Sequence, residues 1–208
     1  MADFDRLTLH TDRLVLRPLR ASDAAAIFAI RSDPQVMRYA SSAPLTTPAD
    51  ASAFIERDAA LIAAGDVLRL GLERNEDQAL IGSCILFHFN HQCRRAEVGY
   101  EMRRDAWGRG YMHEALLALL QHAFTALALN RIEADIDPRN TASARSLERL
   151  GFSREGLLRE RWIVEGEVSD SALYGLLHAD WLARLQTSNS AHANLSLLPL
   201  AGERAGGG

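Results

Sequence analysis

The sequence predicts an α/β protein, in an α+β arrangement, with a mixed, mostly antiparallel central sheet of about seven strands flanked by about four helices. The first observation behind this class is the length of 208 residues, which suits one well-buried domain. The second is that segments with strand period alternate with longer segments of helical period, and short polar turns join two pairs of strands. We expect residues 1–185 to form a single domain, and residues 186–208, rich in Ser, Asn, Ala and Gly, to form a flexible tail.

The first part of the chain contains one predicted strand and two predicted helices. Residues 13–19 alternate and then reach a proline, which predicts a strand. Residues 22–33 predict a short helix that ends before the next proline. Residues 46–65 predict a longer helix, because Thr47 is suited to cap its start and Gly65 to close its end.

The rest of the chain continues to alternate between strands and helices. In chain order we expect strands over 66–74, 79–89 and 96–102, a helix over 109–128, a strand over 131–137, a helix over 140–152 and two strands within 158–177. The second hairpin is expected to turn at Gly166, and the pattern decays after Trp181. Helices placed between strands imply that both faces of the sheet are partly covered.

The composition argues against several classes of function. A net charge of −4 does not suit a primary nucleic-acid binder, because a phosphate backbone needs a basic face. The two cysteines, Cys84 and Cys93, are no disulfide framework, and His, Cys and Asp show no metal-ligand spacing. No signal peptide is evident, and no apolar run approaches the roughly 20 residues of a membrane span. We therefore expect a cytoplasmic protein without metal, nucleic-acid or membrane partners; monomer and homodimer both remain open.

Two glycines and three arginines surround the start of the helix predicted over 109–128. They are Gly108, Gly110, Arg103, Arg104 and Arg109. Glycines let the backbone approach a ligand closely, and a helix start offers free N–H groups and a dipole that favours an anion. The segment therefore predicts a phosphate site, and a diphosphate is the first candidate for its occupant. The alternative is a glycine turn with solvated arginines. It is not a P-loop, because no Gly-Lys-Ser/Thr follows.

The strand before this turn has one apolar and one polar face. Alternation places Ala96, Val98, Tyr100 and Met102 on one side and Glu97, Gly99 and Glu101 on the other. A glycine inside a strand is typical of a bulge or of close approach by another chain. We expect a bulge at Gly99, whose unpaired N–H groups would hold an amide or an oxyanion.

Three stretches together, "EVGYEM", "RDAWGRGYMHEAL" and "NRIEADIDPRNTASARSLERLGFSREGLLRE", resemble the GCN5-related N-acetyltransferase (GNAT) superfamily. Within it they are similar to the branch that includes the ribosomal-protein N-terminal acetyltransferases (RimJ/RimL-like). The resemblance covers about residues 10–182 and includes the opening "TDRLVLRPLRASDA". It implies the acyl-CoA N-acyltransferase fold and an acetyl-CoA-dependent enzyme.

The resemblance implies a site for acetyl-CoA, as cosubstrate, on the glycine turn and the preceding strand. In that family backbone N–H groups of the turn grip the pyrophosphate, and the pantetheine arm pairs with the strand like an additional strand. By position, the turn residues are Gly108, Arg109, Gly110, Tyr111 and Met112, and the strand residues are Tyr100, Glu101 and Met102. The arm enters where this strand diverges from the one over 131–137.

Further positions correspond less directly to the family pattern. Three residues before the first glycine the family prefers Arg or Gln, where this chain has Asp105. Arg103 and Arg104 are expected to supply the charge instead. Asn140 matches the family asparagine that hydrogen-bonds the cofactor near its pantetheine end. It is also suited to cap the following helix, and both roles stay open.

The chemistry implied is direct attack of a primary amine on the thioester within a ternary complex. The amine must be neutral, the oxyanion stabilised and the departing thiolate protonated. Many relatives use a tyrosine as the acid, at the place where this chain has Leu147. Ser143 matches a serine of the ribosomal-protein branch and is expected to donate to the thiolate. Its alternative role is to satisfy the local backbone.

Glu97 is the first choice of base, since it lies on the strand beside the expected thioester. The alternative is that Glu97 is an ordinary exposed carboxylate on a strand, with no catalytic role. Weaker candidates are Glu101, Asp135 and Glu160, and Asp170 is a candidate contact for a cationic substrate. Histidine side chains titrate near neutral pH, but a solvated loop position is the preferred interpretation of both His88 and His91.

The acceptor is inferred from amine basicity. An α-amine with a pKa of about 7.7–8.0 is roughly 10–15% neutral at pH 7, whereas a lysine amine at about 10.4 is neutral in under ~0.1% of molecules. A modest base therefore suffices for a protein N-terminus. The alternatives are a small-molecule amine (an antibiotic, polyamine or amino acid) and a non-catalytic CoA-binding domain.

Overall fold

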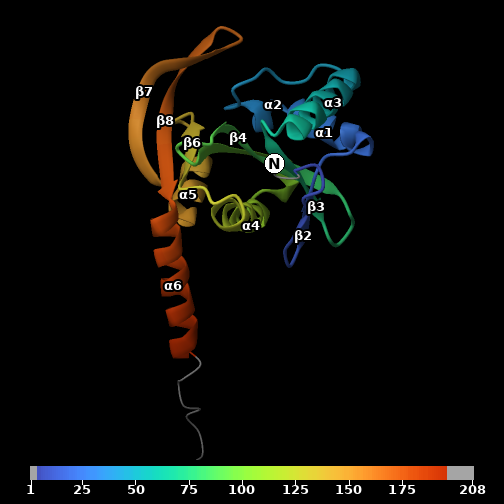
Figure 1. Ribbon diagram of the computed structural model, residues 1–208. Coiled ribbons are helices and arrows are strands. Elements are labelled where there is room, and N and C mark those ends of the chain that lie inside the picture. The colour runs from blue at the N-terminus through green and yellow to red at the C-terminus, as the bar shows by residue number, and fades with distance from the viewer. Residues whose placement is uncertain (1–3, 196–208) are drawn as a thin grey trace, which may run out of the picture.

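The chain's structure is a computed structural model that describes residues 4–195. Its centre is an eight-stranded sheet (Figure 1) in the order β1-β2-β3-β4-β5-β6-β8-β7. Neighbouring strands are antiparallel except for β5 and β6, which are parallel. The strands are β1 (Leu9–His10), β2 (Leu14–Arg17), β3 (Leu68–Arg74), β4 (Leu80–Asn90), β5 (Arg95–Met102), β6 (Arg131–Ile136), β7 (Ser153–Val164) and β8 (Glu167–Leu177). The predicted mixed, mostly antiparallel sheet is confirmed.

Helices cover both faces of this sheet (Figure 1), with α1, α2 and α3 on one face and α4 and α5 on the other. They are α1 (Ala24–Arg31), α2 (Pro34–Met37), α3 (Pro48–Ala64), α4 (Tyr111–Thr125), α5 (Thr141–Leu150) and α6 (His178–Leu195). Two short 3-10 turns, η1 (Ala21–Asp23) and η2 (Arg104–Ala106), precede α1 and α4. The described residues thus have more elements than expected, because β1 and α2 are too short to show a period and α6 lies where the sequence pattern decays.

The start and end of α3 follow from local sequence. The Thr47 side chain accepts a hydrogen bond from the Asp50 N–H at 3.3 Å, and Asp50 accepts in return from the Thr47 N–H at 2.7 Å. This reciprocal cap satisfies N–H groups that the first helical turn leaves unpaired. Gly65 ends the helix with a left-handed φ of 80°. The predicted cap at Thr47 and end at Gly65 are confirmed.

The main core lies between the sheet and α4. Leu116, Leu119 and Phe124 of α4 are buried against the apolar face of the strands. A smaller cluster, which includes Ile27 and Ile55, lies under α1 and α3. Burying a side chain such as Leu119 contributes about 1.5–3 kcal/mol to stability, so α4 is firmly fixed to the sheet. Its N-terminus is therefore held in a defined place at the sheet edge.

The sheet opens between β5 and β6. These strands pair only from Arg95↔Arg131 to Glu97↔Glu133. Beyond that point β5 stays paired with β4 as far as Met102, whereas β6 stays paired with β8. One backbone edge of β5 after Glu97 is therefore unpaired and able to bind an extended ligand.

The bulge expected at Gly99 is absent there, so that prediction is wrong. Gly99 pairs in register with Ile85. A Cβ on Gly99 would lie 3.2 Å from Ile85 Cγ2 and 3.5 Å from Phe87 Cε1, so the glycine makes room for side chains of β4. The irregularity lies on β4, where His88 and Phe89 together oppose one residue of β5.

The last helix, α6, extends away from the sheet (Figure 1). It begins at the end of β8, and Trp181 in its first turns is buried against Phe124, with ring centroids 5.9 Å apart. The helix continues to Leu195, beyond the point where the sequence pattern decays. Residues 196–208 lie outside the described residues. The flexible tail and the boundary at residue 185 stay predictions.

Candidate functional site

The glycine turn leads directly into α4. Gly108 and Gly110 have φ values of 72° and 80°, in the left-handed region that favours glycine. A Cβ on Gly108 would meet nothing within 4 Å, so the backbone conformation and not crowding requires a glycine there. Gly110 is the N-cap of α4, and no side chain among the described residues caps this helix. The first N–H groups of α4 are therefore available to an anion, as the sequence predicts.

Arg13 and Glu114 hold this turn in place. Glu114 accepts hydrogen bonds from Thr11 Oγ1 and Arg13 Nε, both at 2.6 Å. Arg13 also donates to the Arg109 carbonyl at 2.9 Å and lies over the Tyr111 ring, 4.6 Å from its centroid. Burial raises the pKa of Glu114, but the bonds from Thr11 and Arg13 outweigh it and the net pKa is lowered. Sequence analysis missed this support, because Arg13 and Glu114 are far apart in the chain.

The three arginines of the turn do not gather around one point. Arg103 pairs with Asp105 at 2.7 Å, and Arg104 pairs with Asp33, also at 2.7 Å. The Arg103 pair is the main cause of the lowered pKa of Asp105. Arg109 is exposed. Their proposed role in phosphate binding stays a prediction, and it requires that the side chains of Arg103 and Arg104 leave their carboxylate partners.

A cavity of about 800 Å³, here called the α4 cavity, lies beside the glycine turn and the free edge of β5. It brings together most of the predicted cofactor residues: Tyr100, Glu101, Met102, Gly108, Gly110, Tyr111, Met112 and Asn140, together with Ser143. Its lining does not include Arg103, Arg104 or Arg109. Arg145 and Arg149 of α5 line it instead. Sequence analysis missed these two cations, although their spacing of four residues places them on one helix face.

Ser143 and Tyr100 meet at the wall of the α4 cavity. Their hydroxyl oxygens are 2.5 Å apart, and either hydroxyl is able to donate. Burial raises the pKa of Tyr100 to about 12, so its hydroxyl keeps its proton at neutral pH. The Ser143 N–H donates to Asn140 Oδ1 at 3.1 Å, which makes Asn140 the N-cap of α5. The capping role of Asn140 is present, and its role toward a cofactor stays a prediction.

A second cavity of about 570 Å³, here called the hairpin cavity, lies between the segment after α2 and the β7–β8 hairpin. Glu97, His88 and Asp135 line it, with Tyr39 and Trp162 as aromatic walls. Glu97 and Tyr100 are an odd number of positions apart on β5, so their side chains are on opposite faces of the sheet. The predicted base and the predicted donor Ser143 therefore line different cavities, on the two sides of the opening between β5 and β6.

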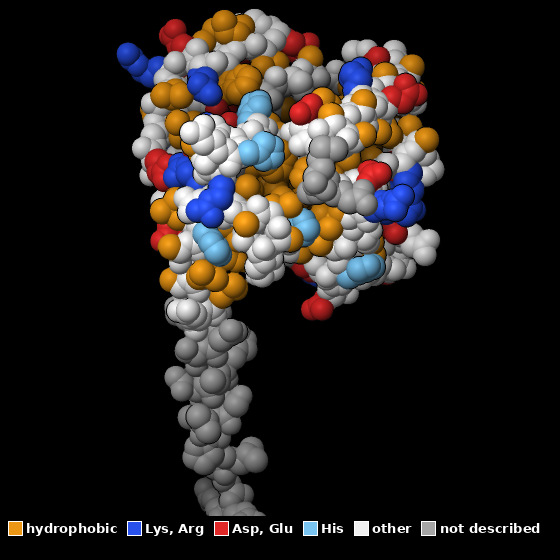
Figure 2. Space-filling model, in the orientation of Figure 1, with side chains coloured by type: hydrophobic (Ala, Val, Ile, Leu, Met, Phe, Trp, Pro, Cys, Tyr) orange, Lys and Arg blue, Asp and Glu red, His pale blue; other side chains and the backbone are white. Residues whose placement is uncertain are grey.

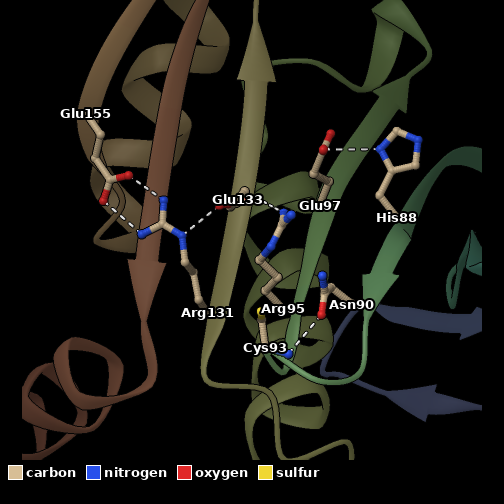
Figure 3. Close-up of polar contacts among 8 residues, drawn as sticks. All are labelled: His88, Asn90, Cys93, Arg95, Glu97, Arg131, Glu133 and Glu155. Carbon is tan, nitrogen blue, oxygen red and sulfur yellow. Dashed lines mark hydrogen bonds and ion pairs between the residues drawn. The ribbon is translucent and has the colours of Figure 1, made fainter.

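Carboxylates on β5 and β6 are mostly held by arginine. Figure 3 shows Arg131 between Glu155 and Glu133, with Arg95 on the other side of Glu133. The Arg131 Nε–Glu133 Oε1 distance is 2.8 Å. The same figure shows Glu97 facing His88 Nδ1 at 3.1 Å. Glu97 thus differs from its neighbours, because its hydrogen-bonding partner is an imidazole and not a guanidinium.

Two of the three weaker candidate bases, Glu101 and Asp135, have arginine partners, whereas Glu160 takes part through its backbone N–H. Glu101 pairs with Arg31 at 2.6 Å, and Asp135 pairs with Arg161 at 3.0 Å. Asp170 accepts a hydrogen bond from the Glu160 N–H at 2.8 Å and so fixes an irregularity in the hairpin. His91 is stacked on Phe89 and does not line the hairpin cavity, whereas His88 does. The preferred interpretation of His88 as a solvated loop residue is right about solvent, since its side chain is 67% exposed, but the residue belongs to β4 and not to a loop.

The remaining features of the described residues concern charge, membrane span, metal clusters and thiols. Acidic and basic side chains are interspersed on the face seen in Figure 2. Among residues 4–195, no helix is long and apolar enough to cross a membrane. Within the same range, no cluster of His, Cys, Asp and Glu is suited to hold a metal ion. Cys84 is buried and Cys93 is exposed, and both are free thiols.

The fold of the chain is similar to that of solved acetyltransferases. RimJ of Mycobacterium smegmatis, solved in complex with CoA-disulfide, superposes with a TM-score of 0.75 at 27% identity, over 88% of this chain and 97% of that one. The chain therefore shares its fold with a protein that was solved with a CoA compound. A family model described as the acetyltransferase (GNAT) domain matches residues 13–153. The chain belongs to the GNAT acetyltransferase family, as the sequence resemblance predicted.

Two curated relatives agree with this family. The uncharacterised N-acetyltransferase p20 of Bacillus licheniformis is 36% identical over 174 residues, which is 84% of this chain and 98% of that protein. The ribosomal protein uS5 alanine N-acetyltransferase of Escherichia coli is 30% identical over 121 residues, which is 56% of this chain and 61% of that protein. The chain is an N-acetyltransferase.

Proposed function

We propose that this N-acetyltransferase transfers the acetyl group of acetyl-CoA to a protein N-terminal α-amine, by direct attack in a ternary complex. The observation that carries the proposal is the opening between β5 and β6. A helix start suited to a diphosphate lies on one side of it, and a carboxylate in a separate cavity lies on the other. Two substrates are thus able to approach one point from opposite faces.

The α4 cavity fits the chemistry of acetyl-CoA. The free N–H groups from Gly108 to Met112 suit the diphosphate, and Arg145 and Arg149 suit further phosphate charge. The unpaired edge of β5 offers N–H and C=O groups to the amides of the pantetheine arm. The structure of Mycobacterium smegmatis RimJ is a complex with CoA-disulfide, which supports the same class of occupant here.

The reaction divides between the two faces of β5. The thioester supplies the acetyl group: a bond forms from the amine nitrogen to the carbonyl carbon, and the carbon–sulfur bond breaks. Glu97 accepts the proton that an ammonium group must lose before attack, directly or through one water. Ser143, whose oxygen is fixed by Tyr100, donates a hydrogen bond to the departing sulfur. The nitrogen loses a second proton as the carbon–sulfur bond breaks, and the departing sulfur gains one, so the products are an amide and the CoA thiol.

The acceptor is proposed from its basicity and from one relative. A carboxylate such as Glu97 is a weak base. It is better suited to deprotonate an α-amine than a lysine amine, because the α-amine has the lower pKa. The uS5 alanine N-acetyltransferase is named for an alanine of a ribosomal protein, and an alanine side chain has no amine of its own. A small-molecule amine is the second candidate, and the hairpin cavity of about 570 Å³ has room for one.

A thiol-release assay tests the proposed function. The panel contains peptides with different N-terminal residues, the same peptides with blocked α-amines, and small amines such as polyamines. We expect release with free peptides and a return to the hydrolysis rate with blocked ones. Turnover confined to the small amines would contradict the proposed acceptor, and no turnover with CoA still bound would contradict catalysis itself.

A further inference from the structure

The irregular pairing on β4 changes which face His88 occupies. Phe87 pairs with Glu97, and Asn90 pairs with Arg95, so two residues of β4 oppose one of β5. His88 has a φ of 51°, which is uncommon for a residue other than glycine. Phe87 and His88 are consecutive, yet both line the hairpin cavity. In a regular strand they would point to opposite faces, so the bulge is what brings His88 beside Glu97.

Glu97 stands apart from the other carboxylates on its two strands. Each of the others on β5 and β6 has an arginine partner: Glu101 has Arg31, Glu133 has Arg95 and Arg131, and Asp135 has Arg161. A carboxylate paired with arginine keeps a permanent positive partner and is a poor proton acceptor. Glu97 pairs with His88, whose charge changes with pH. The bulge therefore builds a carboxylate–imidazole pair at the opening of the sheet.

We propose that His88 is the positioning residue of the base: its Nδ1–H holds Glu97, and the imidazole sets the charge of the pair. The proposal rests on the proposed function. With Glu97 ionised, a contact of 3.1 Å requires a proton on Nδ1, since two lone pairs would repel. One carboxylate oxygen of Glu97 then accepts the hydrogen bond from His88. This bond orients the carboxylate so that its other oxygen is directed toward the amine.

The charge of the pair decides its function. With a neutral imidazole the pair has a charge of −1, attracts an ammonium group and accepts its proton. With an imidazolium the pair is neutral overall, and Glu97 is held as a poorer acceptor. If the imidazole sets the charge of the pair, acetyl transfer is expected to fall toward acid pH.

Other charged groups face the pair from every side of the hairpin cavity. Asp135 pairs with Arg161, Arg139 pairs with Asp137 and Glu167, and Arg38 and Glu165 complete the charged lining. Arg95, on β5 beside Glu97, pairs with Glu133. These groups are unchanged by a substitution at His88. A comparison of pH profiles between His88 variants therefore isolates the imidazole.

The test compares His88→Asn, His88→Ala and the control His91→Ala. Asparagine places an N–H donor near the position of Nδ1, binds no proton near neutral pH, and tolerates a positive φ. His91 is exposed on the same hairpin and lies outside the cavity lining. The assay is thiol release with the best acceptor of the panel, measured as kcat, KM and pH profile. Calorimetry of acetyl-CoA binding is run for every variant.

We expect His88→Ala to lower kcat about 10-fold or more, with acetyl-CoA affinity within about twofold and His91→Ala unchanged. His88→Asn should recover most of kcat at high pH, and the fall of kcat/KM toward acid pH should become shallower. A wild-type pH profile in His88→Asn, or full activity of His88→Ala, would overturn the role of His88 and leave the proposed function standing. A wild-type protein that turns over no acceptor overturns both. If His88→Ala does not fold, the profile of His88→Asn decides alone.

Discussion

The two faces of β5 differ in chemistry although they belong to one strand. On the α4 side, Tyr100 and Ser143 form a buried pair of hydroxyls that keeps its protons at neutral pH. On the hairpin side, Glu97 lies among ion pairs and has a histidine partner. The comparison shows how alternation along a strand places the proposed proton donor and the proposed proton acceptor on opposite faces. A reaction that needs a donor and an acceptor at one carbon atom requires that this carbon lie in the gap between β5 and β6.

The largest expected effect comes from the turn that positions the α4 side. Replacing Gly108 by proline fixes φ near −65° where the structure has 72°. The N–H groups at the start of α4 then no longer converge, and we expect CoA affinity to fall by more than about 100-fold. Calorimetric titration measures this, and circular dichroism shows whether the fold is kept. Unchanged affinity would mean that the diphosphate binds elsewhere.

Removing the base on the hairpin side should have the next largest effect. Glu97→Gln keeps the size of the side chain but cannot accept a proton. We expect kcat to fall about 100-fold, while the dissociation constant for acetyl-CoA changes little. Glu133→Gln is a matched control, because that carboxylate is paired with Arg95 and Arg131 and lines neither cavity. An equal loss in both variants would indicate a general electrostatic effect and not a base at Glu97.

The donor pair on the α4 side should contribute less than the base. Ser143→Ala is expected to lower kcat about 10-fold, because the departing sulfur loses one hydrogen bond. Tyr100→Phe should lower kcat about 3-fold, since Ser143 loses only its fixed orientation. The double variant should resemble Ser143→Ala alone, because both residues act through one hydroxyl. Additive losses would show that Tyr100 acts independently.

The smallest expected effect concerns the support of the glycine turn. Glu114 has a lowered pKa, so its ion pair with Arg13 adds stability above pH 4.5, its ordinary value, and loses it as pH falls through the lower folded value. Glu114→Gln should therefore lower Tm at pH 7 by a few degrees, about 2–4 °C. The difference from wild type should vanish in strong acid. A constant difference at all pH values would mean that packing, not charge, is lost.

Local signals in the sequence predicted much of this arrangement. Thr47 and Gly65 bound α3 as expected, because caps depend on adjacent residues. Gly108 and Gly110 likewise form the predicted turn into α4. The predicted bulge at Gly99 was wrong. A glycine inside a strand is equally typical of a bulge and of crowding by neighbouring side chains, and here the crowding side chains belong to β4.

Contacts between distant segments could not be predicted. Tyr100 and Ser143 are 43 positions apart, and only the packing of α5 on the sheet brings their hydroxyls together. Arg13 and Glu114 are 101 positions apart along the chain. The position of His88 depends on a bulge whose register is set by β5. In each case the residue type was visible in the sequence and its partner was not.

A crystal structure of the chain with bound CoA tests the central claim most directly. The claim is that the reacting thioester lies in the gap between β5 and β6, with Ser143 on one side and Glu97 on the other. We expect the diphosphate on the N–H groups that follow Gly108, and the sulfur within about 4 Å of Ser143 Oγ. A sulfur atom outside the gap, with Ser143 and Glu97 both out of reach, would contradict it.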